Sequence, residues 1–298
     1  MAVIEVENLA KRYGDIEAVR NVNLEVHEGE VFALLGPNGA GKSTTVEILE
    51  GHRARTSGRV SVLGVDPETA GRDFRDRIGI VLQSSGIEDE LTVREALEFY
   101  GATYRDPRDP MEVLEMVGLT EAVDRRVSAL SGGQQRRIDL GLGLVGRPEL
   151  LFLDEPTTGF DPSARRQSWE LIAGLRELGT TIVLTTHYME EAEVLADRVG
   201  VIVKGEIVAG GTPSELMDAA GDTVISFRIP AGTSLDGFPV PDVEHIGDEV
   251  TCRTASPTRM LHDITGWAIE RGLELDDLEA ARPSLEDVYL DLAHREDT

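Results

Sequence analysis

The sequence predicts an α/β protein with a mainly parallel central sheet, followed by a small α+β domain. Two observations predict the first part: short, continuously apolar runs, typical of strands buried on both faces, alternate with amphipathic helical segments. A third observation concerns the C-terminal part, where the composition becomes more acidic while strand and helix patterns continue. Because parallel strands need crossover connections, the alternation of strands and helices favours a parallel sheet.

Four apolar runs are the candidate strands of the parallel sheet: residues 31–35, 150–153, 181–185 and 198–203. A helix pattern over residues 163–178 lies between two of them and follows the cap-like pair Asp161-Pro162. Regular alternation in the first 30 residues suggests antiparallel strands at one side. Residues from about 84 to 130 are rich in helix patterns, so we expect a helical subdomain there.

A domain boundary is expected near residues 219–221, dividing the chain into residues 1–221 and 222–298. The second part carries 17 acidic and 6 basic residues, which makes it about twice as acidic per residue as the first. Apolar periodicity predicts a strand over 224–229 and helices over 258–271 and 285–292. We therefore expect a folded accessory domain and not a disordered acidic tail.

Composition excludes several classes of function. The 298 residues contain 29 Lys and Arg against 55 Asp and Glu, a net charge of −26, which disfavours a nucleic-acid partner and an anionic lipid surface. The single cysteine, Cys252, excludes an intramolecular disulfide and a multi-cysteine zinc site. No signal peptide pattern and no apolar run of 18 residues is present, so we expect a cytoplasmic protein without direct membrane insertion.

A glycine-rich segment after the first apolar run matches the pattern G-x-x-x-x-G-K-[ST]. It consists of Gly36, Pro37, Asn38, Gly39, Ala40, Gly41, Lys42 and Ser43. Its glycines let backbone N–H groups surround a phosphate, and the following helix N-terminus adds positive potential. Lys42 is expected to reach the β- and γ-phosphates of a nucleotide, Ser43 to ligate Mg²⁺ and Thr44 to contact the α-phosphate region. The alternative interpretation is a strand-to-helix turn that binds no ligand, and it does not explain why a lysine stands at position 42.

A pair of carboxylates ends the apolar run at 150–153. Asp154 and Glu155 therefore lie at the carboxyl end of a buried strand, which is where α/β sheets bind ligands. Asp154 is expected to hold Mg²⁺, directly or through water, and Glu155 to act as the general base for an attacking water. The alternative interpretation is that the two acids are solvated side chains at a turn, and the presence of the phosphate-binding pattern in the same chain disfavours it.

The segment Leu130–Gln134 reads LSGGQ and resembles, without a mismatch, the signature of ATP-binding-cassette (ABC) ATPases. The residues concerned are Ser131, Gly132, Gly133 and Gln134, here called with Leu130 the signature segment. A serine and two glycines at a helix start can form a second anion site from free N–H groups. The resemblance covers about residues 1–221 and implies an ABC cassette of the P-loop NTPase fold, with a parallel core sheet, an antiparallel β subdomain and a helical subdomain.

The resemblance also implies roles for four further residues. Tyr13 matches the aromatic residue that stacks on adenine, and Gln83 matches the glutamine that touches Mg²⁺ and water. Asp161 matches the aspartate of the loop that crosses the ATP-bound dimer interface. His187 matches the histidine that contacts the γ-phosphate during hydrolysis.

ABC ATPases bind ATP as head-to-tail dimers, so the resemblance implies a homodimer in which each phosphate loop faces the partner's signature segment. The C-terminal stretch 282–290 resembles the closing motif of daunorubicin-resistance-type exporter ATPases. We therefore expect an ATPase subunit that powers export of a drug, lipid or other amphiphile through a separate multi-span permease, peripheral at the inner face of the membrane. The alternative is a stand-alone ABC ATPase that switches a soluble partner. The accessory domain could stabilise the dimer or bind a cationic cargo, and the sequence leaves both open.

Two departures from the family pattern stand out. Gly141 and Gly143 occupy the helix after the signature segment, where the family usually has alanines, and we expect local looseness there because helical glycine costs about 1 kcal/mol relative to alanine. Phe160 replaces the usual leucine before Asp161 but keeps a hydrophobic side chain.

Overall fold

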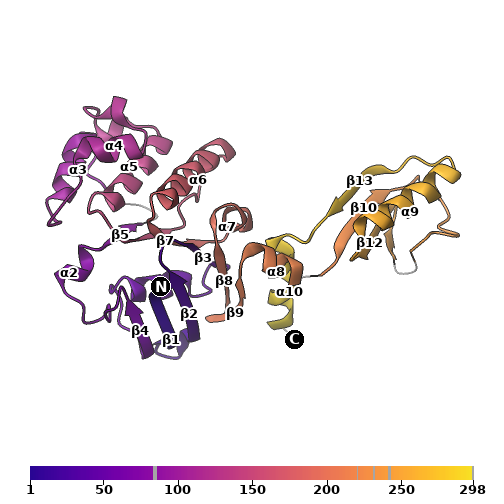
Figure 1. Ribbon diagram of the computed structural model, residues 1–298, viewed down its shortest axis with the longest axis horizontal. Helices are drawn as coiled ribbons and strands as arrows, with labels where there is room; N and C mark the ends of the chain where they lie inside the picture. The colour runs from indigo at the N-terminus through magenta and orange to yellow at the C-terminus, as the bar shows by residue number, and fades with distance from the viewer. Residues whose placement is uncertain (83–85, 220, 231, 241–242, 297–298) are drawn as a thin grey trace. The chain divides into compact units, whose positions relative to one another are not determined.

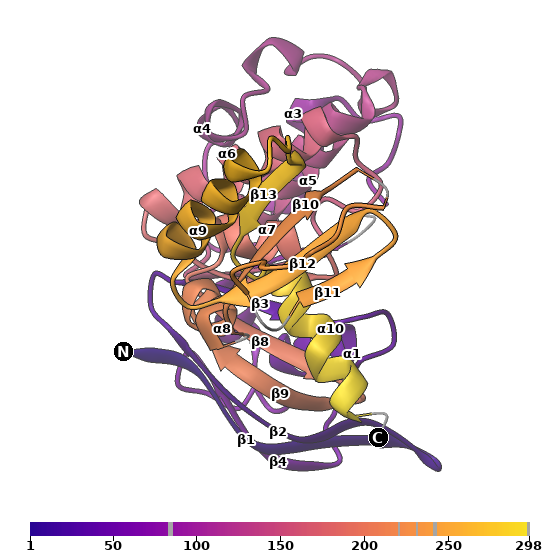
Figure 2. The same ribbon diagram turned by 90° about the vertical axis from the view of Figure 1, so that its right-hand side faces the viewer.

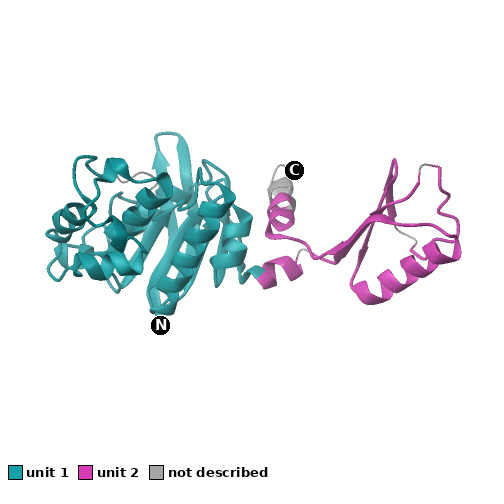
Figure 3. Ribbon diagram, turned by 90° about the horizontal axis from the view of Figure 1, so that it is seen from above, with its two compact units in different colours: residues 1–213 teal, residues 214–298 magenta. Residues whose placement is uncertain are grey.

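The computed structural model describes residues 1–82, 86–219, 221–230, 232–240 and 243–296. The chain divides into two compact units, residues 1–213 and 214–298, shown in different colours in Figure 3. Each unit is described by itself. Residue 220, within the boundary predicted at 219–221, lies outside the described residues, so that boundary stays a prediction.

The first unit is built around a six-stranded sheet with the order β5-β6-β7-β3-β8-β9 (Figure 1). Its strands are β3 (Val31–Leu35), β5 (Ile78–Val81), β6 (Leu150–Asp154), β7 (Thr181–Thr186), β8 (Arg198–Val203) and β9 (Glu206–Gly211). All pairs are parallel except β8 with β9. Every residue of β3 and β7 is buried, as is every residue of β6 and β8 except Asp154 and Arg198, so the four apolar runs are confirmed as strands covered on both faces.

An antiparallel sheet with the order β2-β1-β4 accompanies the parallel one, as the alternation in the first 30 residues predicts. Its strands are β1 (Ala2–Tyr13), β2 (Ile16–His27) and β4 (Ser57–Val62). One hydrophobic core joins the two sheets and includes Leu9, Phe32 and Phe152, with Val46 and Ile48 from helix α1 (Lys42–Leu49). Figure 1 shows α6 (Pro162–Glu177) and α7 (Met189–Leu195) on the side of the six-stranded sheet that faces away from the antiparallel sheet. This packing fixes α1, and hence the loop before it, between two layers.

A group of helices follows β5 and packs at one end of the first unit (Figure 1). It contains α3 (Val93–Gly101), α4 (Pro110–Met116) and α5 (Gly132–Leu144), with short helical turns at Thr120–Ala122 and Val127–Ala129; the short helix α2 (Arg72–Arg75) precedes β5. The glycines of α5 mark close approaches. A Cβ on Gly143 would lie 2.6 Å from Val81 Cγ2, and one on Gly141 would lie 3.0 Å from Val113 Cγ1. The departure from the family pattern thus has a packing cause, because small residues let α5 approach β5 and α4.

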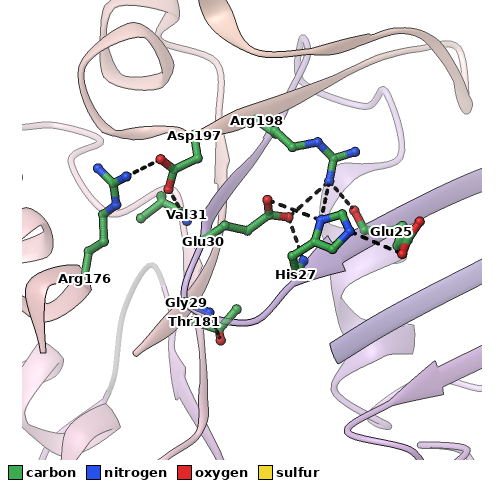
Figure 4. A network of polar contacts seen from close by, with 9 residues as sticks. All are labelled: Glu25, His27, Gly29, Glu30, Val31, Arg176, Thr181, Asp197 and Arg198. Carbon is green, nitrogen blue, oxygen red and sulfur yellow. Dashed lines mark hydrogen bonds and ion pairs between the residues drawn. The ribbon is translucent and has the colours of Figure 1, made fainter. Parts of the chain in front are cut away.

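Polar contacts hold the amino-terminal edge of the parallel strands (Figure 4). The backbone N–H of Val31, at the start of β3, donates to Asp197 Oδ2 at 2.9 Å, and Arg176 from the end of α6 donates to the same carboxylate. Arg198, at the start of β8, lies 3.2 Å from Glu30 Oε1. These contacts tie the strand starts together. Ligands are expected at the opposite edge, where the strands end, because α/β sheets bind ligands outside the carboxyl ends of their strands.

The second unit is a small α+β fold (Figure 2). Its described residues form the antiparallel sheet β11-β12-β10-β13 and the helices α8, α9 and α10. The bounds are α8 (Pro213–Ala219), β10 (Thr223–Arg228), β11 (Val243–Ile246), β12 (Glu249–Thr254), α9 (Pro257–Glu270), β13 (Asp276–Ala281) and α10 (Leu285–Glu296). Ile225, Phe227 and Val250 of the sheet share a core with Ile264 of α9. Among the residues described in both units, no helix is long and apolar enough to cross a membrane.

Candidate active site

The loop between β3 and α1, residues 36–41, has the geometry of a phosphate cradle. A Cβ on Gly36 would lie 2.3 Å from Ile202 O, and one on Gly41 would lie 2.4 Å from Ala18 O. Gly41 also has a φ of 105°, in the region that favours glycine. It is the N-cap of α1, and no described side chain caps that helix end, so the first N–H groups remain available to an anion.

Lys42 is the cation of this loop and is buried, with only 4% of its surface exposed. Its Nζ donates to Gly36 O at 2.7 Å and Pro37 O at 3.1 Å, and lies 3.6 Å from Glu155 Oε1. Burial lowers the pKa of Lys42 from its usual value, although the negative charges of Glu155 and Asp154 oppose the shift. The loop carbonyls therefore hold the ammonium group close to where a bound phosphate would place its charge.

The two carboxylates lie at the carboxyl end of β6, as predicted, and Thr185 of β7 contacts the Asp154 carboxylate and the Glu155 backbone. The Thr185 hydroxyl donates to Asp154 Oδ1 at 2.6 Å, and the N–H of Glu155 lies 3.1 Å from both Thr185 O and Thr185 Oγ1. Glu155 has a φ of 45°, a strained conformation for a residue with a side chain. The strand pairing β6–β7 thus stabilises a sharp turn that aims the Glu155 carboxylate along the edge of the sheet.

Three groups surround the Glu155 carboxylate. Thr158 Oγ1 donates to Oε2 at 3.0 Å, and His187 Nδ1 lies 3.3 Å from Oε1, the oxygen that Lys42 also approaches. Burial alone would raise the pKa of Glu155, but the hydrogen bond from Thr158 and the interactions with His187 and Lys42 outweigh it and lower that pKa. The carboxylate is therefore ionised at neutral pH and can accept a proton.

A cavity of about 360 Å³ joins the phosphate cradle to the carboxylates. Its lining residues are Ala18, Asn38, Gly39, Gly41, Lys42, Ser43, Thr44, Asp154 and Glu155. Apart from Ala18 of β2, the residues come from the loop after β3, the start of α1 and the end of β6, and β7 is the one strand between β3 and β6 in the sheet. The structure therefore brings the two motifs, more than 100 residues apart in the chain, to one site.

The oxygen donors at this cavity suit Mg²⁺ shared with phosphate groups. Ser43 and Asp154 both line it, whereas among the described residues no group of three or more His, Cys, Asp or Glu could hold a metal. Mg²⁺ is usually bound by one or two protein oxygens together with substrate phosphates and water. The donor set fits that mode.

The signature segment and Asp161 are not among the residues lining this cavity. Ser131 caps α5: its hydroxyl accepts from Gln134 N at 3.3 Å, and Gln134 Oε1 accepts from Ser131 N at 3.1 Å. Asp161 caps α6 by accepting from Ser163 N and Ala164 N, both at 2.9 Å. Ser131, Gly132 and Gly133 are exposed at the start of α5, and Asp161 is exposed at the start of α6.

Tyr13 and Gln83 complete the predicted set. Tyr13 ends β1 and is 39% exposed, with Lys11 Nζ 5.0 Å and Arg53 Cζ 5.4 Å from its ring centroid. Its face is thus already used by cations, and an adenine ring would have to share or replace them. Gln83 lies outside the described residues.

Thr185 and Thr158 are contacts that the sequence reasoning missed. Each hydrogen-bonds one of the two carboxylates, Thr185 from the neighbouring strand and Thr158 from the loop after β6. Thr185 ends one of the apolar runs predicted to be strands. A hydroxyl group at the carboxyl end of such a strand is the one sequence feature that could have marked Thr185 as a site residue.

Glu50, at the C-terminus of α1, is a buried carboxyl group, 5% exposed. Burial, followed by the negative charges of Asp154 and Glu47, raises its pKa from 4.5 to about 8. His52 Nδ1 lies 3.3 Å from its Oε2. Because the folded pKa exceeds the unfolded one, the folded protein keeps a proton that the unfolded chain releases between pH 4.5 and about 8.

Glu50 is therefore expected to make the stability of the nucleotide-free protein pH-dependent. Its contribution is fully present below pH 4.5 and is lost as pH rises through about 8, by about 1.4 kcal/mol per pH unit within that window. Urea unfolding of the wild type and Glu50→Gln in EDTA should give stability curves that diverge with rising pH, in favour of the variant. Parallel curves from pH 5 to 8 would show that Glu50 ionises normally; Glu177→Gln on α6 is the control.

Comparisons with known proteins agree with this geometry. Residues 19–158 match the family model described as ABC transporter, and residues 223–284 match one described as ABC transporter domain-containing protein-like, C-terminal domain. The daunorubicin resistance ATP-binding protein DrrA2 of Streptomyces coeruleorubidus is 39% identical, over 98% of this chain and 95% of that protein. The linearmycin resistance ATP-binding protein LnrL of Bacillus subtilis is 35% identical, over 98% and 99%. The Nod factor export ATP-binding protein I of Rhizobium meliloti is 40% identical, over 98% and 88%.

Solved structures show the same cassette fold. The cbiO1 protein of Clostridium perfringens, part of an ABC transporter complex, matches with a TM-score of 0.67 and 30% identity, over 73% of this chain and 91% of that one. A dimeric ATP-binding cassette in a post-hydrolysis state, bound to ADP and Pi, matches with a TM-score of 0.63 and 28% identity, over 70% and 98%. The cassette fold, the near full-length relatives and the assembled cavity agree in one conclusion: the chain belongs to the ABC transporter ATP-binding proteins and is an ABC-type ATPase that binds ATP and ADP.

Proposed function

We propose that this ATPase is the nucleotide-binding subunit of an exporter, which works as a homodimer with a separate multi-span permease at the cytoplasmic face of the cell membrane. The names of its relatives support export: one is named for Nod factor export, one for daunorubicin resistance and one for linearmycin resistance. The similarity to them extends over nearly the whole chain, including the second unit. The proposed cargo is a drug, lipid or other amphiphile, and its identity depends on the permease.

One observation carries the dimer. Gly132 and Gly133 occupy the exposed first turn of α5, yet a Cβ on either would meet, among the described residues, no atom within 4 Å apart from its chain neighbours and the backbone of its own helix. Neither has the positive φ that favours glycine. Glycine there is therefore not required by the chain's own fold, and close approach of an external group, here the phosphates held by a second copy, supplies the reason.

The residues at the cavity support hydrolysis by direct attack of water. Backbone N–H groups of the loop and the Lys42 ammonium would bind the β- and γ-phosphates. Glu155 would take a proton from water while the water oxygen attacks the γ-phosphorus and the bond to the β-phosphate oxygen breaks, giving ADP and phosphate. His187, already 3.3 Å from Glu155 Oε1, would contact the γ-phosphate and orient that carboxylate.

The remaining assignments complete the proposal. Ser43, Asp154 and Gln83 would hold Mg²⁺, which when bound neutralises phosphate charge, and Tyr13 would stack on adenine. In the closed dimer, Ser131, Gly132, Gly133 and Gln134 of one copy would meet the γ-phosphate bound by the other, with Asp161 at the interface. ATP then stabilises the closed dimer by its higher affinity for that state, and hydrolysis reopens it. A stand-alone ATPase acting on a soluble partner would use the same cycle and differ in what it binds.

Gly133→Asp tests the dimer without disturbing the fold. The chain leaves room for the side chain, and an acid in the first turn of α5 is favoured by the helix dipole, so folding and ATP binding should persist. With ATP, light scattering should show a dimer for Glu155→Gln and a monomer when Gly133→Asp is added, because the new carboxylate would face the partner's phosphates. Gln167→Glu on α6 controls for added charge. A double variant that still dimerises with ATP would contradict the proposed interface.

A further inference from the structure

Arg136 is a buried arginine one turn into α5, two residues after the end of the signature segment, and is 6% exposed. Its Nε donates to Pro156 O at 2.9 Å, and its Nη1 donates to Leu82 O at 2.6 Å. Nη1 also lies 3.6 Å from Asp139 Oδ2. The guanidinium thus bridges two backbone carbonyls, one after the end of β5 and one immediately after Glu155.

Burying this charge is costly. Burial lowers the pKa of Arg136, and the negative charges of Asp139, Asp154 and Glu191 oppose that shift. An apolar side chain of similar volume would usually pack as well or better at such a position. Simple packing therefore does not explain the arginine, whereas a planar fork of donors that joins two fixed carbonyls does.

The carbonyl that Arg136 holds belongs to the turn that carries Glu155. The N–H of Glu155 is bonded to Thr185 on one side of the turn. On the other side, Thr157, which is fully buried, donates through Oγ1 to Glu191 Oε1 at 2.7 Å. Glu191 lies on α7, the helix that follows His187, and also accepts from Trp169 Nε1 at 3.1 Å. Groups from α5, α7 and β7 therefore hold three successive residues, the first of them in the strained left-handed conformation.

We propose that Arg136 is a positioning residue for ATP hydrolysis: by holding the Pro156 carbonyl, opposite Glu191 at Thr157, it fixes the turn that aims the Glu155 carboxylate. The inference rests on the proposed role of Glu155 as general base. It also makes α5 a direct connection between the signature segment and that base, because Arg136 lies on the same helix. Displacement of a reacting group by about 1 Å can lower turnover by about 100-fold, so loss of this contact should affect kcat far more than binding.

Arg136→Met is the principal test, because methionine keeps much of the volume and removes both hydrogen bonds. At a temperature where circular dichroism shows the variant folded, we expect kcat to fall about 10- to 100-fold, with KM and ATP affinity within about threefold of wild type. Arg137→Met is the matched control, since the Arg137 guanidinium contacts Gly118 O and Gln167 Oε1 and not the turn that carries Glu155. A purely structural role would lower the melting temperature of Arg136→Met and leave kcat of the folded protein unchanged, which would overturn the inference.

Arg136→Lys gives a second measurement should the methionine variant not fold. Lysine keeps the buried charge but cannot bridge two carbonyls with a rigid fork. We expect a folded protein with unchanged ATP affinity and a kcat between those of the wild type and the methionine variant. Wild-type kcat in this variant would also overturn the inference.

A double-mutant cycle with Glu155→Gln separates this inference from the function on which it rests. If Arg136 acts through Glu155, Glu155→Gln should lower kcat much less in the Arg136 variant than in the wild type. Equal losses in both backgrounds would mean that the two residues act independently and would overturn the inference. If Glu155→Gln alone left kcat unchanged, the assignment of Glu155 as general base would fail, and with it the inference that Arg136 acts through Glu155. In that case a fall in kcat seen only in the Arg136 variant would mean that Arg136 acts on hydrolysis by another route.

Discussion

Glu155→Gln is expected to bind ATP normally while kcat falls by about 100- to 10,000-fold, the usual contribution of a general base. The amide keeps the shape of the side chain and can still accept the hydrogen bond from Thr158, but it cannot take a proton from water. The Thr158 hydroxyl donates to the Glu155 carboxylate and the Lys42 ammonium lies 3.6 Å from it, and both contacts favour its ionised form. Phosphate release and direct ATP binding, measured on the same preparation, check both halves of the prediction.

The comparison variant is Glu177→Gln, an exposed residue near the end of α6 that lies away from the cavity. It should hydrolyse ATP at the wild-type rate. Turnover by Glu155→Gln within about tenfold of the wild type would assign the proton transfer to another group and remove the central residue of the proposed mechanism.

Lys42→Ala is expected to abolish measurable ATP binding rather than slow its hydrolysis. The change removes the buried ammonium and leaves Gly36 O and Pro37 O without their donor, so the loop loses its charge and part of its conformational support. Charge-assisted hydrogen bonds contribute about 1.5–3 kcal/mol each, so two or more lost phosphate contacts weaken binding at least about 100-fold. Isothermal titration with ATP measures this directly.

Arg75→Ala, which removes an exposed cation on α2, is the control and should bind ATP as the wild type does. If Lys42→Ala bound ATP with nearly wild-type affinity, the phosphate cradle would have to lie elsewhere. If it bound ATP but did not hydrolyse it, Lys42 would be confined to the chemical step.

The parallel sheet could be predicted from the sequence because burial on both faces forces an apolar composition on β3, β6, β7 and β8. β13 shows why other strands could not. Its residues Asp276–Ala281 are all exposed and include three acids, so neither alternation nor hydrophobicity marks it; pairing with β10 makes it a strand. The short strand β5 was also missed, and Gly79 within it lies against Gly143 O, a close approach that no local pattern reveals.

The candidate site divides in the same way. The phosphate loop and the carboxylate pair are contiguous motifs, so their residues could be named before their arrangement was known. The groups that hold Glu155 in place could not be named in this way, because Thr185 lies on the neighbouring strand and Arg136 reaches the turn after β6 from helix α5. Arg136 and Arg137 are neighbours, so the sequence does not indicate which of the two matters. In the structure Arg136 is buried whereas Arg137 is partly exposed.

The most direct test of the proposed exporter is the composition of the ATP-bound complex. Tagged Glu155→Gln would be expressed in its own cells, held with ATP and purified from membranes in mild detergent, and the co-purifying chains identified by mass spectrometry. Glu155→Gln with Lys42→Ala, which should not bind ATP, is the control. The account predicts two copies of this chain with a multi-span permease, enriched over the control. A stable ATP-bound dimer that carries only a soluble partner, or none, would contradict it.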